Sequence, residues 1–304
     1  MKKGTGMTSD KTLSSKPSLM ARLPDFIQLT RLDRPIGIYL LMWPTLWALW
    51  IAADGTPSFK LCFIFITGVI LTRTAGCIVN DFADRKFDGH VSRTSQRPLA
   101  TGKISSKEAL TLAAGIGILC FVLVWFTNTR TILFSFGGLL LACTYPYMKR
   151  HTYYPQLVLG AAFAWAVPMA FTAVQKSVPS YAWLIYLATV SWTMAYDTLY
   201  AMVDREDDLK IGIKSTAILF GDADLAMIGL LEAIAFISMW FLGNHLSFSH
   251  WYFAGLIVAA ALWGWQLWHC RQRDRDRCFK AFLHNHWVGA VIFTGLFLHY
   301  FLPS

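Results

Sequence analysis

The stretch Leu61–Asp88, "LCFIFITGVILTRTAGCIVNDFADRKFD", joins an apolar run directly to a row of acidic side chains. Its first part, Leu61–Val79, contains one charged residue, Arg73. About 20 mostly apolar residues are enough to cross a membrane as a helix. The run therefore predicts a membrane span, and the oxygen-bearing side chains at its end are Asn80, Asp81, Asp84 and Asp88.

The composition of the whole chain supports a membrane protein. Hydrophobic types make up 55% of the 304 residues and charged types 15%, whereas soluble domains carry about 25% charged residues. The 13 Trp, 11 Tyr and 22 Phe residues agree with this, because aromatic rings favour membrane interfaces. The six cysteines show no spacing typical of zinc sites, which favours buried apolar roles. We interpret "HNH", residues 284–286, as a polar loop.

The hydropathy pattern predicts an all-α polytopic membrane protein with nine transmembrane helices. We expect residues 1–24, which are polar, to form a flexible cytoplasmic tail, and residues 25–304 to form a single transmembrane domain. The predicted spans are Ile36–Ala53, Phe59–Val79, Ala109–Phe126, Thr131–Tyr147, Gln156–Val174, Tyr181–Met202, Leu225–Leu242, Trp251–Trp268 and Trp287–Phe301.

Basic residues predict the orientation. Only Lys60, Arg130 and Lys176 fall at the short connections that would face one side of the membrane. The other Lys and Arg residues mark the opposite side as cytoplasmic. We therefore expect a protein of the bacterial inner membrane whose N-terminus and acidic clusters face the cytoplasm. This asymmetry accounts for the net charge of +9, so the charge is no reason to expect nucleic acid as a partner.

A second acidic row resembles the first. Asn80, Asp84 and Asp88 follow each other at steps of four, and so do Tyr200, Asp204 and Asp208 in "YDTLYAMVDREDD". Residues four apart lie on one face of a helix, so Asn80, Asp84 and Asp88 predict one stripe, with Asp81 close to it. Asp197, Asp204 and Asp208 predict a second stripe, with Tyr196 and Tyr200 beside it. Each stripe falls at the end of an even-numbered span, which indicates a faint internal repeat.

Carboxylates stacked at this spacing repel one another, and a divalent cation would neutralise them. Mg²⁺ binds one or two carboxylates and completes its shell with water and phosphate oxygens. Basic side chains then have a role as a phosphate clamp. The members of that predicted clamp are Arg93, Lys149, Lys210 and Lys214. The alternative interpretation is that these carboxylates are solvated and pair with neighbouring Arg and Lys residues.

Arg73 is a separate signal. It lies seven residues before Asn80 inside a predicted span and points in the same direction. A charge at that depth is costly unless it faces the bundle interior and finds a partner. The two acidic rows could together hold Mg²⁺ around one diphosphate, and we interpret Arg73 as an anchor for an anionic group on a second substrate, deeper than that diphosphate. The alternative is that its side chain snorkels to the interface.

Several strings together resemble the UbiA-type membrane prenyltransferases. "NDFADRKFD" fits the pattern NDxxDxxxD, and "DREDD" lies within the second acidic segment. The flanking strings "RPIG", "GHVSRTSQRPL", "YPYMKR" and "IGIKSTAILFG" extend the resemblance over the chain from about Leu23 onward. The resemblance implies a helical bundle around a central cavity that is capped by cytoplasmic loops. It also implies transfer of a polyprenyl group from polyprenyl diphosphate to 4-hydroxybenzoate, at the ring carbon ortho to the hydroxyl, in ubiquinone biosynthesis.

The same resemblance implies roles for individual residues. Asn80, Asp84 and Asp88 are expected to bind Mg²⁺ on one side and Asp204 and Asp208 on the other, and these four aspartates are the expected catalytic residues. The expected diphosphate contacts are Arg34, Arg93, Tyr145 and Lys149. Arg73 is expected to bind the benzoate carboxylate. Apart from the resemblance, the basic clamp described above would include Lys210, and the rings of Tyr196 and Tyr200 are candidates to stabilise an allylic cation.

Two alternatives stay open at this point. The acceptor of the prenyl group could be another compound, such as a naphthoate, homogentisate or haem. A cation-coupled transporter is a second possibility, since acidic residues inside membranes often line ion pathways. The acidic rows lie at the ends of predicted spans and not near their centres, which favours the enzyme.

Overall fold

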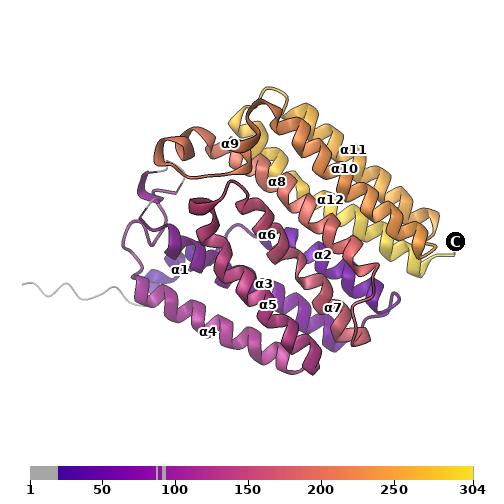
Figure 1. Ribbon diagram of the computed structural model, residues 1–304. Coiled ribbons are helices and arrows are strands. Elements are labelled where there is room, and N and C mark those ends of the chain that lie inside the picture. Colours follow the sequence, from indigo (N-terminus) through magenta and orange to yellow (C-terminus); the bar gives the residue numbers. More distant parts are fainter. Residues whose placement is uncertain (1–19, 87, 91–93, 304) are drawn as a thin grey trace, which may run out of the picture.

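The computed structural model describes residues 20–86, 88–90 and 94–303, and this part of the chain is helical without a strand (Figure 1). Most of the predicted N-terminal tail lies outside the described residues, and so does Arg93.

Twelve α-helices make up the described chain, with short 3-10 turns η1 (Met20–Arg22), η2 (Asp88–His90) and η3 (Gly221–Ala223). The helices are α1 (Leu23–Thr30), α2 (Ile36–Ala52), α3 (Phe59–Asp84), α4 (Ser106–Trp125), α5 (Thr129–His151), α6 (Pro155–Ala164), α7 (Ala166–Gln175), α8 (Ala182–Ile211), α9 (Thr216–Phe220), α10 (Asp224–His245), α11 (His250–His269) and α12 (Arg275–Phe301).

Polar residues at the helix starts explain several boundaries. Ser105 and Glu108 form a capping box at the start of α4, in which each side chain accepts a hydrogen bond from the other's backbone N–H. The Ser58, Asn128 and Asp274 side chains cap α3, α5 and α12 in the simpler way, by accepting a backbone N–H three residues on. Local sequence therefore fixes where these helices begin.

All nine predicted span segments are helical, but their lengths differ from the predictions. Gln156–Val174 is divided at Trp165 into α6 and α7, and the Trp165 Nε1 donates a hydrogen bond to the Phe134 carbonyl of α5 at 2.7 Å. Within the described residues, six helical stretches are long and apolar enough to cross a membrane, and α2 is a shorter apolar helix. The protein is an integral membrane protein, and the count of nine crossings stays a prediction.

The interpretation of residues 284–286 as a loop is wrong, because they lie within α12. The buried Asn285 side chain is satisfied there by other helices. Its Oδ1 accepts a hydrogen bond from Trp192 Nε1 of α8 at 2.8 Å, and its Nδ2 donates to Gln266 Oε1 of α11 at 2.9 Å. A polar residue can occupy a helix core when its hydrogen bonds are made.

The core of the bundle forms where α2, α8 and α12 meet. α2 packs on α7 and α12, and α8 packs on α6, α10 and α12. The Trp47 and Trp192 rings stack across α2 and α8 with centroids 5.4 Å apart. This packing holds α8, which carries the second acidic stripe.

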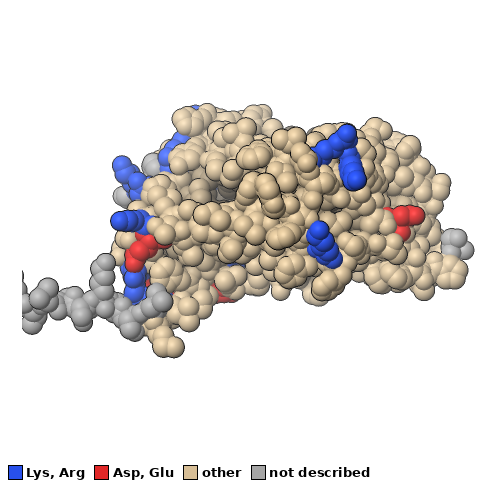
Figure 2. Space-filling view, turned by 90° about the horizontal axis from the view of Figure 1, so that it is seen from below, with Lys and Arg blue, Asp and Glu red and all other residues tan. Residues whose placement is uncertain are grey.

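Charged side chains gather at one end of the molecule. Figure 2 shows many of the Lys, Arg, Asp and Glu residues at the left-hand end of this face, and the rest of the face is mostly uncharged, with a few separate basic and acidic groups. The connection after α3 and the α8–α9 turn also lie at that end (Figure 1). The two acidic segments are therefore at the same end of the bundle.

Candidate active site

Both acidic stripes line one cavity of about 1550 Å³. Asn80, Asp81 and Asp84 enter it from the last turn of α3, which ends at Asp84. From α8, the cavity-lining residues are Tyr196, Asp197, Tyr200, Ala201, Asp204 and Asp208. Two segments about 120 positions apart in the sequence thus line one cavity. This arrangement is necessary if both rows of oxygen donors are to bind one ligand.

Asp88 lines the cavity but does not continue the helical stripe. It lies in η2, after α3 has ended, so the expectation that Asn80, Asp84 and Asp88 share one helix face is wrong. An arginine holds this carboxylate in place, because Arg97 Nη1 lies 3.1 and 3.0 Å from its two oxygens. Asp88 therefore reaches the cavity from the loop, through a contact with a residue nine positions later.

Arg97 also pairs with Asp81, at 2.9 Å from Nη1 to Oδ1. Arg31 contacts the same carboxylate, with Nη2 at 3.1 and 2.9 Å from its two oxygens. Asp81 is buried, so the two arginines balance a charge that would otherwise be costly. Asp81 is thereby paired with two positive side chains.

Asp84 has a different environment. Its Oδ2 accepts hydrogen bonds from Lys149 of α5 and, at 3.2 Å, from Asn80 Nδ2. Its Oδ1 is buried and has no hydrogen-bond partner among the described residues, and Arg150 Nη2 lies 3.8 Å from it. A buried carboxylate oxygen without a hydrogen bond is costly, and a cation is the kind of ligand that would relieve that cost.

These residues fit a divalent cation that is completed by a substrate. Carboxylate and amide oxygens are suitable ligands for Mg²⁺. In the described part of the chain, no three or more His, Cys, Asp or Glu side chains lie close enough together to bind one metal ion by themselves. Mg²⁺ commonly takes only one or two carboxylates together with phosphate oxygens and water, so this donor set suits a metal that arrives with a phosphorylated ligand.

Burial changes the acid–base behaviour of Asp88, which lies outside the membrane-spanning helices. Burial raises the pKa of the Asp88 carboxyl to about 6, and the positive charge of the neighbouring Arg97 opposes that rise. The carboxylates of Asp81 and Asp88 in turn raise the pKa of the Arg97 guanidinium against the effect of its burial. Arg97 is therefore a permanent positive charge on the cavity wall.

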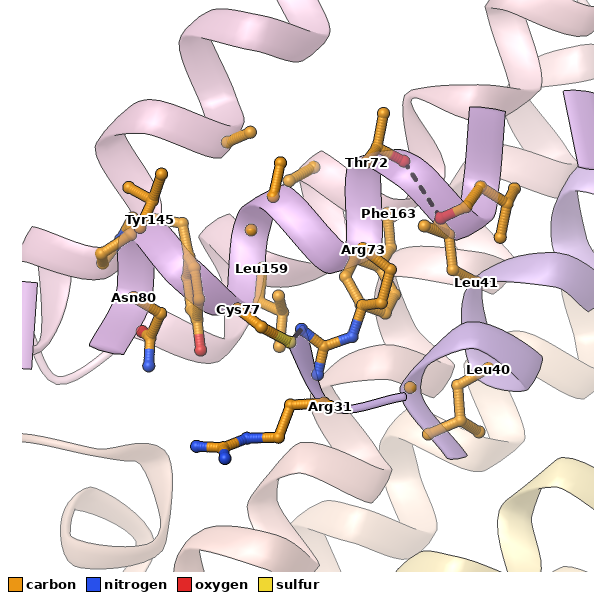
Figure 3. Close-up of a pocket in the computed structure, with 18 of the residues that line it drawn as sticks. Arg31, Leu40, Leu41, Thr72, Arg73, Cys77, Asn80, Tyr145, Leu159 and Phe163 are labelled. Atoms are coloured by element: carbon orange, nitrogen blue, oxygen red, sulfur yellow. Dashed lines mark hydrogen bonds between the residues drawn. The ribbon is translucent and has the colours of Figure 1, made fainter. Parts of the chain in front are cut away.

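Arg73 lies deeper along α3 and also lines the cavity. Its Nη1 is 2.9 Å from Cys77 Sγ, its Cζ lies 6.0 Å from the centre of the Phe163 ring, and its Nε is buried without a hydrogen-bond partner among the described residues. Figure 3 shows the guanidinium beside Cys77 and Phe163, with Tyr145 and Asn80 farther along the same space. The side chain faces the bundle interior, as the functional interpretation of Arg73 requires.

Away from the charged end, apolar side chains of α4 and α5 line the cavity. They include Leu110, Ala113, Gly117, Phe121, Val124, Phe136, Leu139 and Cys143. The outer surfaces of these two helices expose large apolar residues, which suits contact with lipid. The cavity thus combines a charged end with an apolar extension.

The remaining predicted site residues fall into two groups. Arg34, Tyr145, Lys149 and Lys214 line the cavity, although the Arg34 side chain is 73% exposed. Lys210 is not among the lining residues, and its Nζ instead lies 3.3 Å from Asp207 on the outside of α8. The helical register explains this difference, since position 210 is two residues past Asp208 and points to another face.

Sequence reasoning missed Arg31 and Arg97 as members of the site. Arg97 belongs to the string "GHVSRTSQRPL", which carries part of the family resemblance, so the sequence did indicate that this segment lies near the site. Arg31 pairs with Asp81, which is 50 positions away, and no local sequence pattern predicts such a contact.

Comparison with known proteins gives a consistent result. Residues 41–289 match the model of the UbiA prenyltransferase family. A protein named 4-hydroxybenzoate octaprenyltransferase from Pseudomonas syringae pv. tomato is 59% identical over 290 residues, which cover 95% of this chain and 98% of that protein.

Solved structures share the fold. The apo structure of a UbiA homolog from Aeropyrum pernix K1 superposes with a TM-score of 0.75 and 25% identity, covering 85% of this chain and 96% of the homolog. A UbiA homolog from Archaeoglobus fulgidus, solved with GPP and Mg²⁺, gives a TM-score of 0.69 at 17% identity, with 90% and 99% of the two chains covered.

Proposed function

This chain belongs to the UbiA prenyltransferase family, and we propose that it transfers a polyprenyl group from polyprenyl diphosphate to 4-hydroxybenzoate. The new bond forms at the ring carbon ortho to the hydroxyl and gives 3-polyprenyl-4-hydroxybenzoate for ubiquinone biosynthesis. The similar protein from Pseudomonas syringae pv. tomato supports the acceptor. One structural observation supports the reaction above all: two acidic stripes, a buried arginine and an apolar extension share one cavity.

The charged end of the cavity binds the diphosphate in this proposal. Mg²⁺ would be held by Asn80, Asp84 and Asp88 on one side and by Asp204 and Asp208 on the other, where it would offset the charge of the diphosphate. Lys149, Arg97 and Lys214 lie on the same walls and present further positive charge. Fixed positive groups of this kind stabilise the negative charge that grows on a leaving diphosphate.

The prenyl chain occupies the apolar extension between α4 and α5 in the same proposal. Breakage of the bond between the prenyl carbon and the diphosphate oxygen leaves an allylic cation. The Tyr196 and Tyr200 rings line the cavity and can present their faces to that charge. Tyr200 is held by Phe282 of α12, with ring centroids 4.7 Å apart. An apolar wall also keeps out water, which would otherwise capture the cation.

Arg73 binds the carboxylate of 4-hydroxybenzoate and fixes the orientation of its ring. The buried Nε without a hydrogen-bond partner supports this assignment, because an anionic ligand would satisfy it. The ring carbon then attacks the allylic carbon, and the displaced ring proton leaves to a base. Arg73 sits on α3 below the acidic residues, so the acceptor would lie deeper than the diphosphate.

The proposal places the enzyme in the bacterial inner membrane with this end in the cytoplasm. The positions of Lys60, Arg130 and Lys176, at the opposite connections, support that orientation. Residues 25–304 would form the single transmembrane domain.

A membrane assay tests the function. Membranes containing the chain are supplied with prenyl diphosphates of several lengths and with 4-hydroxybenzoate, a naphthoate or homogentisate, in Mg²⁺ or in EDTA. The proposal predicts a prenylated 4-hydroxybenzoate only with Mg²⁺, and little product from the other acceptors. Release of diphosphate without prenylated 4-hydroxybenzoate, or equal turnover in EDTA, would contradict it.

A further inference from the structure

The Arg73 guanidinium lies against the backbone of α2 at Gly37. A Cβ atom at position 37 would meet Nε of Arg73 and would lie 2.7 Å from its Nη2 and 2.8 Å from its Cζ. Real Cβ atoms do not approach other heavy atoms that closely. The guanidinium therefore occupies space that is open only because residue 37 is a glycine.

Two other side chains contact the same guanidinium. Cys77 lies 2.9 Å from Nη1, and the Phe163 ring of α6 lies 6.0 Å from Cζ (Figure 3). Nε is buried and has no hydrogen-bond partner in the described part of the chain. The Arg73 guanidinium is thus enclosed by residues of α2, α3 and α6, and Gly37 is the residue of α2 that lies against it.

From this arrangement we infer that Gly37 is a positioning and specificity-determining residue for the acceptor. The missing side chain sets how deep the Arg73 guanidinium sits, and so sets where the acceptor carboxylate binds relative to the prenyl carbon. The inference rests on the proposed function, in which Arg73 binds 4-hydroxybenzoate. In this inference Gly37 does not contact the acceptor carboxylate itself and acts through the position of Arg73.

The atoms in conflict make a selective effect possible. They belong to the far end of a flexible side chain and not to a neighbouring backbone, so an alanine at position 37 displaces the guanidinium and leaves the helices in place. Alanine is also the better helix former, and Gly37 lies within α2. The substitution should therefore preserve the fold while it moves the anchor.

The test is the kinetics of Gly37→Ala with both substrates. We expect the KM for 4-hydroxybenzoate to rise on the order of tenfold, because a misplaced binding group weakens the productive complex. The KM for the prenyl diphosphate should change by less than about twofold, as for interactions left intact. The matched control is Gly115→Ala on α4, a helical glycine outside the cavity lining where a Cβ meets nothing within 4 Å.

A second variant keeps the test decisive if Gly37→Ala is unstable. In an Arg73→Ala background the clash is absent, so the double variant should melt at the same temperature as Arg73→Ala alone. In that background Gly37→Ala should also change kcat/KM for 4-hydroxybenzoate by less than about twofold. Equal effects of Gly37→Ala with and without Arg73 would overturn the inference, and so would an unchanged KM for 4-hydroxybenzoate in the single variant. If the unsubstituted chain prenylates no 4-hydroxybenzoate, the proposed function itself fails, and the inference fails with it.

Discussion

Lys149 of α5 forms an ion pair with Asp84 at the last residue of α3, across 65 positions of sequence. The pair joins two helices that both line the cavity and places an ammonium group beside a carboxylate proposed to bind Mg²⁺. The lysine is therefore positioned to contact a diphosphate held at Asp84. It also limits the repulsion between neighbouring carboxylates on α3.

Replacing Lys149 should weaken diphosphate binding. We predict that Lys149→Ala raises the KM for the prenyl diphosphate on the order of tenfold, because a charged hydrogen bond to the substrate is lost. The KM for 4-hydroxybenzoate should change little. Steady-state kinetics in membranes measure both values, with Lys107→Ala, on the exposed side of α4 and outside the cavity, as the control. A larger effect on the benzoate KM would contradict the placement of Lys149.

Replacing one proposed metal ligand should nearly abolish turnover. We predict that Asp84→Ala, Asp88→Ala, Asp204→Ala and Asp208→Ala each lower kcat/KM by about a hundredfold or more, because charge stabilisation of the leaving group is lost. Each variant should still insert into membranes. The control is Asp276→Ala, an exposed carboxylate in the first turn of α12. Near-normal turnover in Mg²⁺ for any two of the four would refute the metal assignment.

Metal affinity should depend on pH through Asp88. Its pKa is raised to about 6 by burial, and metal binding requires the deprotonated carboxylate. As pH falls below about 6, protons compete for this group, so we predict that Mg²⁺ binding weakens between about pH 7 and about pH 5 and levels off at higher pH. Binding of Mn²⁺ as a Mg²⁺ substitute, followed by electron paramagnetic resonance, measures this without involving the acceptor. An affinity that stays constant across this range would contradict the prediction.

A second charged cluster should matter for stability. The buried Asp224 of α10 forms ion pairs with Arg205 of α8 and with Arg273, whose Nε lies 3.0 Å from Oδ1. Removing Asp224 leaves the largely buried Arg205 without its counter-charge, which is destabilising. We predict that Asp224→Ala lowers the melting temperature of the detergent-solubilised protein clearly, whereas Asp222→Ala, which keeps the backbone carbonyl that binds Arg273, does not. Equal melting temperatures would show that the cluster does not hold the end of α8.

The helical fold could be predicted from sequence because hydropathy determines which segments are apolar. The helix ends could not, since charged residues can continue a helix past the membrane. α8 extends from Ala182 to Ile211, beyond the predicted end at Met202, and α12 begins at Arg275, well before Trp287. In both helices the extra turns are polar, and hydropathy alone does not distinguish a polar helix from a loop.

The site was predictable to the extent that its residues follow a local pattern. The four-residue steps indicated Asn80, Asp84, Asp204 and Asp208, which all line one cavity. Local spacing did not reveal that Asp88 follows the end of α3, because Arg97 holds it through a tertiary contact. Lys210 was also expected at the site but lies outside its lining, because its register in α8 directs it to another face of the helix.

The central claim is that both acidic stripes bind one metal-loaded diphosphate. A crystal structure of the protein with Mn²⁺ and a non-cleavable prenyl thiodiphosphate tests it most directly, because anomalous scattering locates the metal. The account predicts metal peaks at both Asp84 and Asp204, joined by a single diphosphate, with the prenyl chain between α4 and α5. Metal and diphosphate confined to one stripe, with the other stripe bearing no ligand, would contradict it.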